Sequence, residues 1–364
     1  MLSPPRFCAD GPPFEPVFGV SIKGDFMSML GVFSKHFAKT AQLCIAALLA
    51  GAIFPGPTHS QTINFGSAVQ MVDNVVNNGS PTIIVFNNQL VMYYVNHSNA
   101  TIYVDFGLSG NPSSTGIVVY NSGLTDVGVC VLNGQVLLSY VYPTFNPTYL
   151  ALATSTDGVH FGTPLLQSYG AGGIGNQYPD VAFTPALTSD GTTAYIATVG
   201  NDHRVYMSYT TDGTTIQPLV GNGVSVSAYT TVSRPSLTMY NGAPWVGFTS
   251  NTPGPVEHEA IVGLANGTNA PEVGGAISWG YKNLNGSCAG LALLSYNGIL
   301  YAFAEDDTGS QWLKYIFSNG GTSWSGLNWA GNQMRWTPSL TVLGSTVYLA
   351  YQDPGNTNIS YRHN

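Results

Sequence analysis

The feature that most constrains the fold is a hairpin pattern that recurs six times along the chain. Each copy is a short apolar run, an Asn-Gly-like pair that tolerates positive φ, and a second apolar run. Two copies are nearly alike, RPSLTMYNGAPWVGFT (234–249) and TPSLTVLGSTVYLAY (337–351). A third apolar run follows each hairpin, and a fourth, more variable segment leads to the next copy. The turns are 46 to 57 residues apart, at Asn87, Asn133, Asp190, Asn241, Asn297 and Gly344.

Four antiparallel strands that repeat about every fifty residues are typical of the blades of a β-propeller. We therefore expect an all-β protein, a six-bladed β-propeller of four-stranded antiparallel blades. The last copy stops after its third strand, NTNISYRHN (356–364), and the segment TINFGSAVQ (62–70) precedes the first copy without a blade of its own. We expect this N-terminal strand to pair with the last blade and close the propeller, which would protect the exposed edge of an incomplete sheet.

The composition agrees with an all-β chain and argues against a nucleic-acid partner. Only 8% of the 364 residues are charged, about a third of the usual share of roughly 25%. The 43 glycines and 21 tyrosines suit strands joined by tight turns. The net charge is −8, and six Lys and Arg residues follow residue 60. Nucleic-acid binding requires basic residues that displace counterions, so we expect none.

Residues 1–60 differ from the rest and form a separate N-terminal extension. Basic residues precede the apolar run CIAALLAGAIF (44–54), and small residues follow it, as in a secretory signal. We expect cleavage after Ser60, a true start at Met27 or Met29, and a propeller domain over 61–364. Eleven apolar residues are too few for a bilayer, which needs about 20, so the mature chain should have no membrane span. The expected location is secreted, extracellular or periplasmic; an uncleaved anchor is the alternative.

Two cysteines remain after such processing, Cys130 and Cys288. Two thiols do not form a disulfide framework, and neither belongs to a CxxC pair that would bind a metal. Each lies in or at the start of an apolar run, which favours small buried residues.

Three of the turns between third and fourth strands carry a second motif. They read STDGVHF (155–161), YTTDGTTI (209–216) and SNGGTSW (318–324). These resemble shortened, degenerate Asp boxes, the Ser/Thr-x-Asp-x-Gly-x-Thr-Trp turns of the sialidase-like six-bladed propellers, and the resemblance spans residues 62–364. Locally, Asp157 and Asp212 are expected to cap their own turns, with Phe161 and Trp324 packed between sheets.

The resemblance implies a particular site. Sialidases of this superfamily hold the substrate carboxylate with three arginines, use a tyrosine with a neighbouring glutamate as nucleophile, and use an aspartate as acid/base. One arginine belongs to an Arg-Ile-Pro motif at the entry of the first blade, where this chain has NNGSP (77–81). Arg234 and Arg335 occupy the analogous entry positions of the fourth and sixth blades, which gives an incomplete arginine triad.

Propeller geometry predicts which loops share a face. The loops that enter each innermost strand and those that join second and third strands should lie together, and they carry nine of the 15 acidic residues after residue 60. Polar groups at the mouth of a closed barrel are a usual setting for a ligand site, although loops are in general more polar. The predicted ligand-binding residues are Arg234, Arg335, Trp336, Tyr178, Asp180 and Asp353.

Each of these residues also has a structural interpretation. The two arginines could hold a ligand carboxylate or could pair with Asp180, Asp353 or Glu305 across a blade junction. Trp336 beside Arg335 suits the stacking of a sugar ring next to fork-shaped donors, but aromatic residues also fill blade interfaces. We expect the latter for Trp245, Trp312 and Trp324.

Three carboxylates are the candidates for catalysis if the protein is an enzyme: Asp126, Asp180 and Glu305. The run Glu305, Asp306 and Asp307 offers hard oxygen ligands for calcium, but calcium requires about six or more converging ligands. A solvated loop is the alternative, and we expect neither a metal nor another cofactor.

Two principal hypotheses for function follow, together with a third that the same face permits. The first is a secreted, non-catalytic, carbohydrate-recognising propeller that binds glycans or glycoconjugates as a monomer, because weakly differentiated blades suit multivalent recognition. The second is an exo-acting glycoside hydrolase of sialidase-like type, which requires two carboxyl groups about 5 to 10 Å apart, or the Tyr/Glu pair with an arginine clamp. The third is a protein-interaction scaffold.

Overall fold

A computed structural model gives the fold of the chain. The structure describes residues 62–72, 80–96, 98–119, 126–142, 149–168, 181–200, 202–219, 230–231, 233–250, 259–265, 277–282, 290–305, 312–321, 324–354 and 358–364. Ile63–Asn364 form one compact unit. Every regular element within the described ranges is a strand, and no helix there is long and apolar enough to cross a membrane.

The strands form four-stranded antiparallel sheets, the blades of an all-β propeller as predicted. In chain order, the first three sheets are blade 1, blade 2 and blade 3, and the strands of each follow in order from the innermost outward. Their strands are β2 (Thr82–Phe86), β3 (Gln89–Asn96), β4 (Thr101–Phe106) and β5 (Ser113–Val118); β6 (Gly128–Leu132), β7 (Gln135–Tyr142), β8 (Tyr149–Ser155) and β9 (Leu165–Ser168); β10 (Val181–Ser189), β11 (Ala194–Gly200), β12 (Val205–Thr210) and β13 (Gln217–Pro218).

The remaining strands form blade 4, blade 5 and blade 6, so the described strands are grouped in six sheets. Blade 6 takes its outermost strand from the start of the described chain. The strands are β14 (Ser236–Tyr240), β15 (Ala243–Ser250), β16 (Glu259–Ala265) and β17 (Ile277–Lys282); β18 (Leu291–Tyr296), β19 (Ile299–Glu305), β20 (Trp312–Ser318) and β21 (Asn328–Gln333); β22 (Arg335–Leu343), β23 (Thr346–Gln352), β24 (Ile359–His363) and β1 (Val69–Val72).

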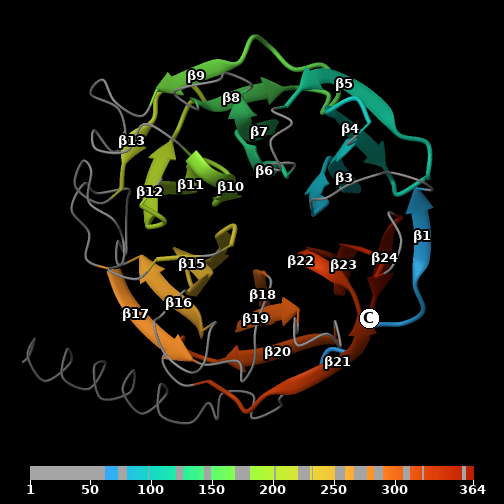
Figure 1. The fold of residues 1–364 in the computed structure, drawn as a ribbon, viewed down its shortest axis with the longest axis vertical. Coiled ribbons are helices and arrows are strands. Elements are labelled where there is room, and N and C mark those ends of the chain that lie inside the picture. The colour runs from blue at the N-terminus through green and yellow to red at the C-terminus, as the bar shows by residue number, and fades with distance from the viewer. Residues whose placement is uncertain are drawn as a thin grey trace, which may run out of the picture. The chain divides into compact units, whose positions relative to one another are not determined.

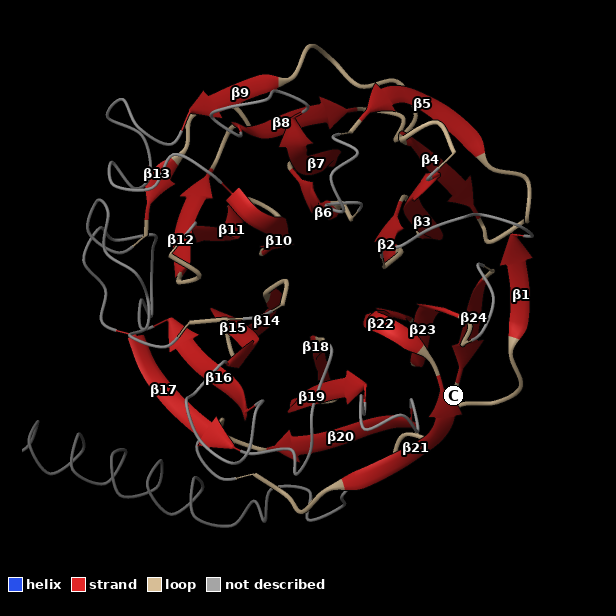
Figure 2. Ribbon diagram, in the orientation of Figure 1, coloured by secondary structure: helices blue, strands red, loops and turns tan. Residues whose placement is uncertain are grey.

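The innermost strands are arranged in a ring at the centre of the fold (Figures 1 and 2). They line a cavity, here called the central channel. Each contacts the innermost strand of the next blade, in the cyclic order β2, β6, β10, β14, β18, β22 and back to β2. Blade 4 is therefore three positions from blade 1 in either direction, on the opposite side of the channel.

The recurring turns explain why the inner strands fold back so tightly. Asn87, Asn133, Asn241 and Asn297 have φ between 49° and 51°, a conformation that asparagine tolerates better than most residues. In blade 4 the turn joins Tyr240 to Ala243, and the pairing register continues without a shift along β14 and β15.

The core consists of side chains between adjacent sheets. Trp245 is buried between blades 4 and 5, with Trp324 packed against the same cluster, as expected. The expectation for Trp312 is wrong, because its side chain is 37% exposed. Trp312 is the first residue of β20, away from the inner strands where packing between blades is densest.

β1 pairs antiparallel with β24, so the first and last strands of the described chain share blade 6. β1 begins at Val69, later than the predicted segment 62–70. The residues before it do not pair as a strand, because each makes its own separate contacts. Ile63 is buried in the cluster between blades 5 and 6. The amide of Gly66 donates to the His363 carbonyl at 2.8 Å, and Arg362 Nη1 donates to the Gly66 carbonyl at 2.9 Å.

Candidate functional site

Arg234 lies at the entry of blade 4 and is held there by its local sequence. Pro235 follows it, which restricts its backbone to an extended conformation. Just before it, the buried Thr231 hydroxyl lies within hydrogen-bond distance of the carbonyls of Ser233 (2.9 Å) and Thr249 (2.8 Å), and its one hydrogen is shared between them or donated to either. The contact with Thr249 links the entry segment to the end of β15. The backbone of Arg234 is therefore held in one position at the channel mouth, and its side chain extends from there.

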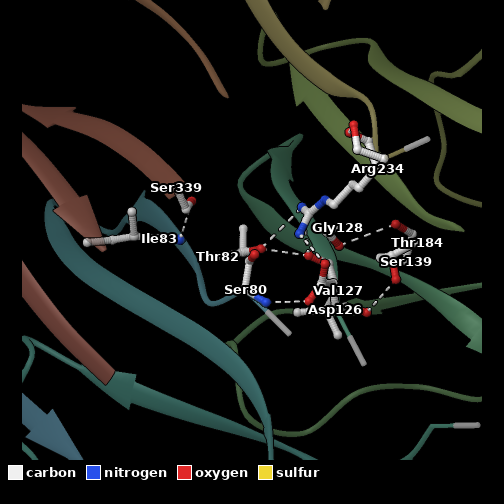
Figure 3. A network of polar contacts seen from close by, with 11 residues as sticks. Ser80, Thr82, Ile83, Asp126, Val127, Gly128, Ser139, Thr184, Arg234 and Ser339 are labelled. Atoms are coloured by element: carbon white, nitrogen blue, oxygen red, sulfur yellow. Dashed lines mark hydrogen bonds and ion pairs between the residues drawn. The ribbon is translucent and has the colours of Figure 1, made fainter. Parts of the chain in front are cut away.

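The Arg234 guanidinium contacts the entries of two other blades (Figure 3). Its Nη2 donates to the Val127 carbonyl of blade 2 at 3.1 Å and to the Thr82 hydroxyl of blade 1 at 3.4 Å. Its Nη1 lies 3.6 Å from Asp126 Oδ2. Since blade 4 is opposite blade 1, this side chain spans the mouth of the channel.

Asp126 is held by three separate segments. Its Oδ1 accepts a short hydrogen bond from the Ser80 amide, its Oδ2 faces Arg234, and its backbone carbonyl accepts the Thr184 hydroxyl at 3.2 Å. Burial raises the pKa of Asp126 above the ordinary carboxyl value, and the charge of Arg234 opposes that rise. Neither side chain is fully buried: that of Arg234 is 14% exposed and that of Asp126 is 17% exposed.

Two groups of this cluster, the Arg234 guanidinium and the Ser80 hydroxyl, could make hydrogen bonds that they do not make with the described residues. A guanidinium has five N–H donors, and the contacts of Arg234 use both of Nη2 and one of Nη1. The buried Ser80 hydroxyl has no partner there either. Buried polar groups are normally satisfied, so such groups favour a bound water or ligand beside them.

The arginine partner differs from those that the sequence suggests. Arg234 pairs with Asp126, which the sequence marks only as a catalytic candidate. Of the three partners that the sequence suggests, Asp180 and the side chain of Glu305 lie outside the described residues. Asp353 instead accepts the Ser360 hydroxyl at 2.8 Å, within blade 6. Entry loops are expected to share a face, so the pairing of two entry residues could have been anticipated from that rule.

The other candidates lie partly or wholly outside the described residues. Arg335 and Trp336 begin β22 and Glu305 ends β19, and only their backbone is described. Tyr178, Asp180, Asp306 and Asp307 are outside the described ranges, as is Cys288. The described residues contain no group of three or more His, Cys, Asp or Glu that could hold a metal ion.

The central channel encloses a cavity of about 570 Å³. All six innermost strands line it, from Thr82 and Arg234 at the entry end to Val85, Met239 and Gly191 at the hairpin end. Cys130 is buried against it, as expected for a small buried residue, and burial raises the pKa of its thiol.

The two nearly identical hairpins have an equivalent serine, five residues before each turn, that joins neighbouring blades. Ser236 Oγ accepts the Leu293 amide of blade 5 at 2.9 Å, and Ser339 Oγ accepts the Ile83 amide of blade 1 at 3.0 Å. An innermost strand is bonded to a neighbour on one side only, so these hydroxyls satisfy amides that would otherwise face the channel. The repeated hairpin is thus a junction between blades.

The turns that resemble Asp boxes lie by the hairpins, opposite the entry loops. The Asn133 side chain of the β6–β7 turn donates to the Thr211 carbonyl at 2.8 Å. Asp157 and Asp212 cap their turns as expected: Asp212 Oδ1 accepts the amides of Thr214 and Thr215, both at 2.7 Å. These turns stabilise the fold locally and are separate from the channel mouth.

Comparison with family models and with curated proteins gives no match. Solved structures share the fold at low identity. One is a protein of unknown function from Dyadobacter fermentans (TM-score 0.58, 12% identity, 85% of this chain and 99% of that chain). Another is an α-L-arabinofuranosidase of Fusarium graminearum with arabinobiose (TM-score 0.57, 13% identity, 82% and 98%). A third is the Trypanosoma rangeli sialidase with sialic acid (TM-score 0.51, 11% identity, 85% and 59%).

Proposed function

We propose that the protein binds carbohydrate, without catalysis, at the mouth of its central channel. The observation that carries this proposal is the Arg234 guanidinium, held across the mouth with two N–H donors unused among the described residues. The planar guanidinium presents its N–H donors in a fixed, fork-shaped arrangement. Such donors suit a sugar, because the hydroxyl groups on its ring can each accept and donate hydrogen bonds.

The contacts of Asp126 favour binding over catalysis. Both carboxylate oxygens already interact with protein groups, Oδ1 with the Ser80 amide and Oδ2 with Arg234. A nucleophile or general acid must instead approach the reacting atoms of a substrate. In this arrangement Asp126 positions the arginine, and the arginine contacts the ligand.

The ligand class follows from the polar, hydroxyl-rich mouth and agrees with the names of two proteins that share the fold. One is named as an arabinofuranosidase with arabinobiose and the other as a sialidase with sialic acid. Together with the apolar run at 44–54, this supports a secreted protein that recognises glycans, with Trp336 and Tyr178 as further contacts.

The alternative function is an exo-acting glycoside hydrolase. One observation favours it: burial raises the pKa of Asp126, as a general acid of this type requires. This function requires a second carboxyl group about 5 to 10 Å from the first, and the sequence candidates for it are Asp180 and Glu305.

A glycan array, combined with turnover assays on aryl glycosides and sialosides, distinguishes the two functions. The proposal expects binding to a defined set of glycans and no product. Turnover that Asp126→Asn abolishes, while glycan binding persists, would replace the proposal by the hydrolase. If the folded protein bound no glycan, both the carbohydrate-binding function and the hydrolase function would be excluded.

A further inference from the structure

We propose that the channel itself is a second binding site, entered from the hairpin face, for one neutral molecule of monosaccharide size. Only the class of ligand in this inference, a carbohydrate, rests on the proposed function. The position of the site follows from the cavity, and the channel mouth at Arg234 is not part of the entrance.

The size and limits of the cavity support a small ligand. Pockets for small molecules are typically about 300 to 1,000 Å³, and the channel cavity is about 570 Å³. At one end it meets the Arg234 side chain, which spans the mouth. At the other end it reaches the exposed Gly191 in the β10–β11 turn and the half-buried ends of inner strands such as Met239 and Val342. The hairpin face therefore offers the approach.

At one level of the channel wall, three residues before each turn, two of the six innermost strands carry a threonine and four carry an apolar residue. Thr238 lies two residues after Ser236, and Thr341 lies two residues after Ser339, so each follows its serine on the same side of its strand. Both threonines are half-buried and line the cavity from blades 4 and 6. The equivalent residues of blades 1, 2, 3 and 5 are apolar: Ile84, Cys130, Leu187 and Leu294. A sugar ring, with an apolar face and a rim of hydroxyls, matches a wall that carries both kinds of residue.

The strand edges add hydrogen-bonding groups. Each innermost strand is bonded to a neighbour along one edge only, so its other edge presents amides and carbonyls toward the channel. Ser236 and Ser339 satisfy one amide each. Such donors and acceptors suit a ligand with several hydroxyls, and each hydroxyl can both donate and accept.

The charges of the wall favour a neutral ligand. Arg234 is the one charged side chain among the described residues that line the cavity, and Asp126 already neutralises it. A carboxylate in the channel would be a buried charge without a matched partner, which is unfavourable.

The test is calorimetric titration of the full chain with D-galactose and, as its charged counterpart, D-galacturonate. We expect saturable binding of galactose with one molecule per chain, and affinity for galacturonate at least tenfold weaker. The variant Thr238→Val/Thr341→Val keeps the shape of the wall and removes two hydroxyls, so galactose affinity should fall about tenfold or more. Thr346→Val, outside the cavity lining, is the matched control and should bind as the wild type does.

Thermal unfolding of each variant checks that the fold is retained. Failure to bind galactose, equal binding of galacturonate, or unchanged affinity in the double variant would each overturn the channel site. The glycan array separates this failure from failure of the proposed function. If the protein binds glycans on the array but does not bind galactose in the titration, the proposed site at the channel mouth is retained and only the channel site is excluded.

Discussion

Arg234 Nη1 lies 3.6 Å from Asp126 Oδ2, so a side chain of blade 4 is tied to the entry of blade 2 across the mouth of the channel. The pair joins blades that are not neighbours in the ring, and the same guanidinium also reaches Thr82 of blade 1. It therefore acts as a brace as well as a candidate ligand contact.

The first prediction concerns this brace. Arg234→Met leaves Asp126 with a largely buried charge and no cation, which should lower the free energy of unfolding by about 3 kcal/mol. The double variant Arg234→Met/Asp126→Leu should lose clearly less, because it removes both charges together. Urea denaturation of the four proteins in the cycle measures the difference. Additive losses would show that the two side chains do not interact.

The second prediction concerns the two serines that join blades. Ser236→Ala and Ser339→Ala each leave an innermost amide without its acceptor, which should cost about 1 kcal/mol of stability apiece. They belong to different junctions, so the double variant should lose the sum. The exposed Ser113→Ala, measured in the same urea series, should have little effect. If Ser236→Ala and Ser339→Ala cost no more than Ser113→Ala, the role of the two serines as inter-blade junctions is wrong.

The third prediction concerns blade 6. Arg362 donates to the Tyr351 hydroxyl and to the Gly66 carbonyl, so it secures the chain segment before β1. Arg362→Gln should speed amide hydrogen exchange in β1 with little change in blades 2 and 3. Arg204→Gln, which removes an exposed ion pair with Asp202, is the matched control. Uniformly faster exchange in all blades would contradict a local role.

The fourth prediction is a pH dependence. Hydrogen bonds from the Thr215 and Thr214 amides hold the pKa of Asp212 below its ordinary value. A depressed folded-state pKa contributes stability that is present above the unfolded value, about 3.9, and is lost as pH falls through the folded pKa. Stability should therefore decrease below about pH 4, and Asp212→Asn should reduce that decrease. Urea midpoints between pH 6 and pH 2.5 provide the measurement, and identical pH profiles would refute the assignment.

The propeller architecture was predictable because its signals are local. Asparagine at positive φ in a tight turn, flanked by apolar runs, specifies a hairpin wherever it occurs, and repetition gives the blades. The cluster at the channel mouth was only partly predictable. Position in the repeat placed Arg234 and Asp126 on one face, but which residues meet across the channel depends on side-chain reach and on the ring geometry. The exposure of Trp312 was missed for the same reason, since sequence gives the strand but not its distance from the dense inner core.

The most direct test of carbohydrate binding at the mouth is calorimetric titration with the strongest ligand from the glycan array. Arg234→Lys keeps the charge but loses the fork of donors, so affinity should fall about tenfold or more if that fork holds the sugar. Arg204→Lys, at an exposed arginine of the β11–β12 loop, should leave affinity unchanged. Equal affinity of wild type and a folded Arg234→Lys would contradict the account.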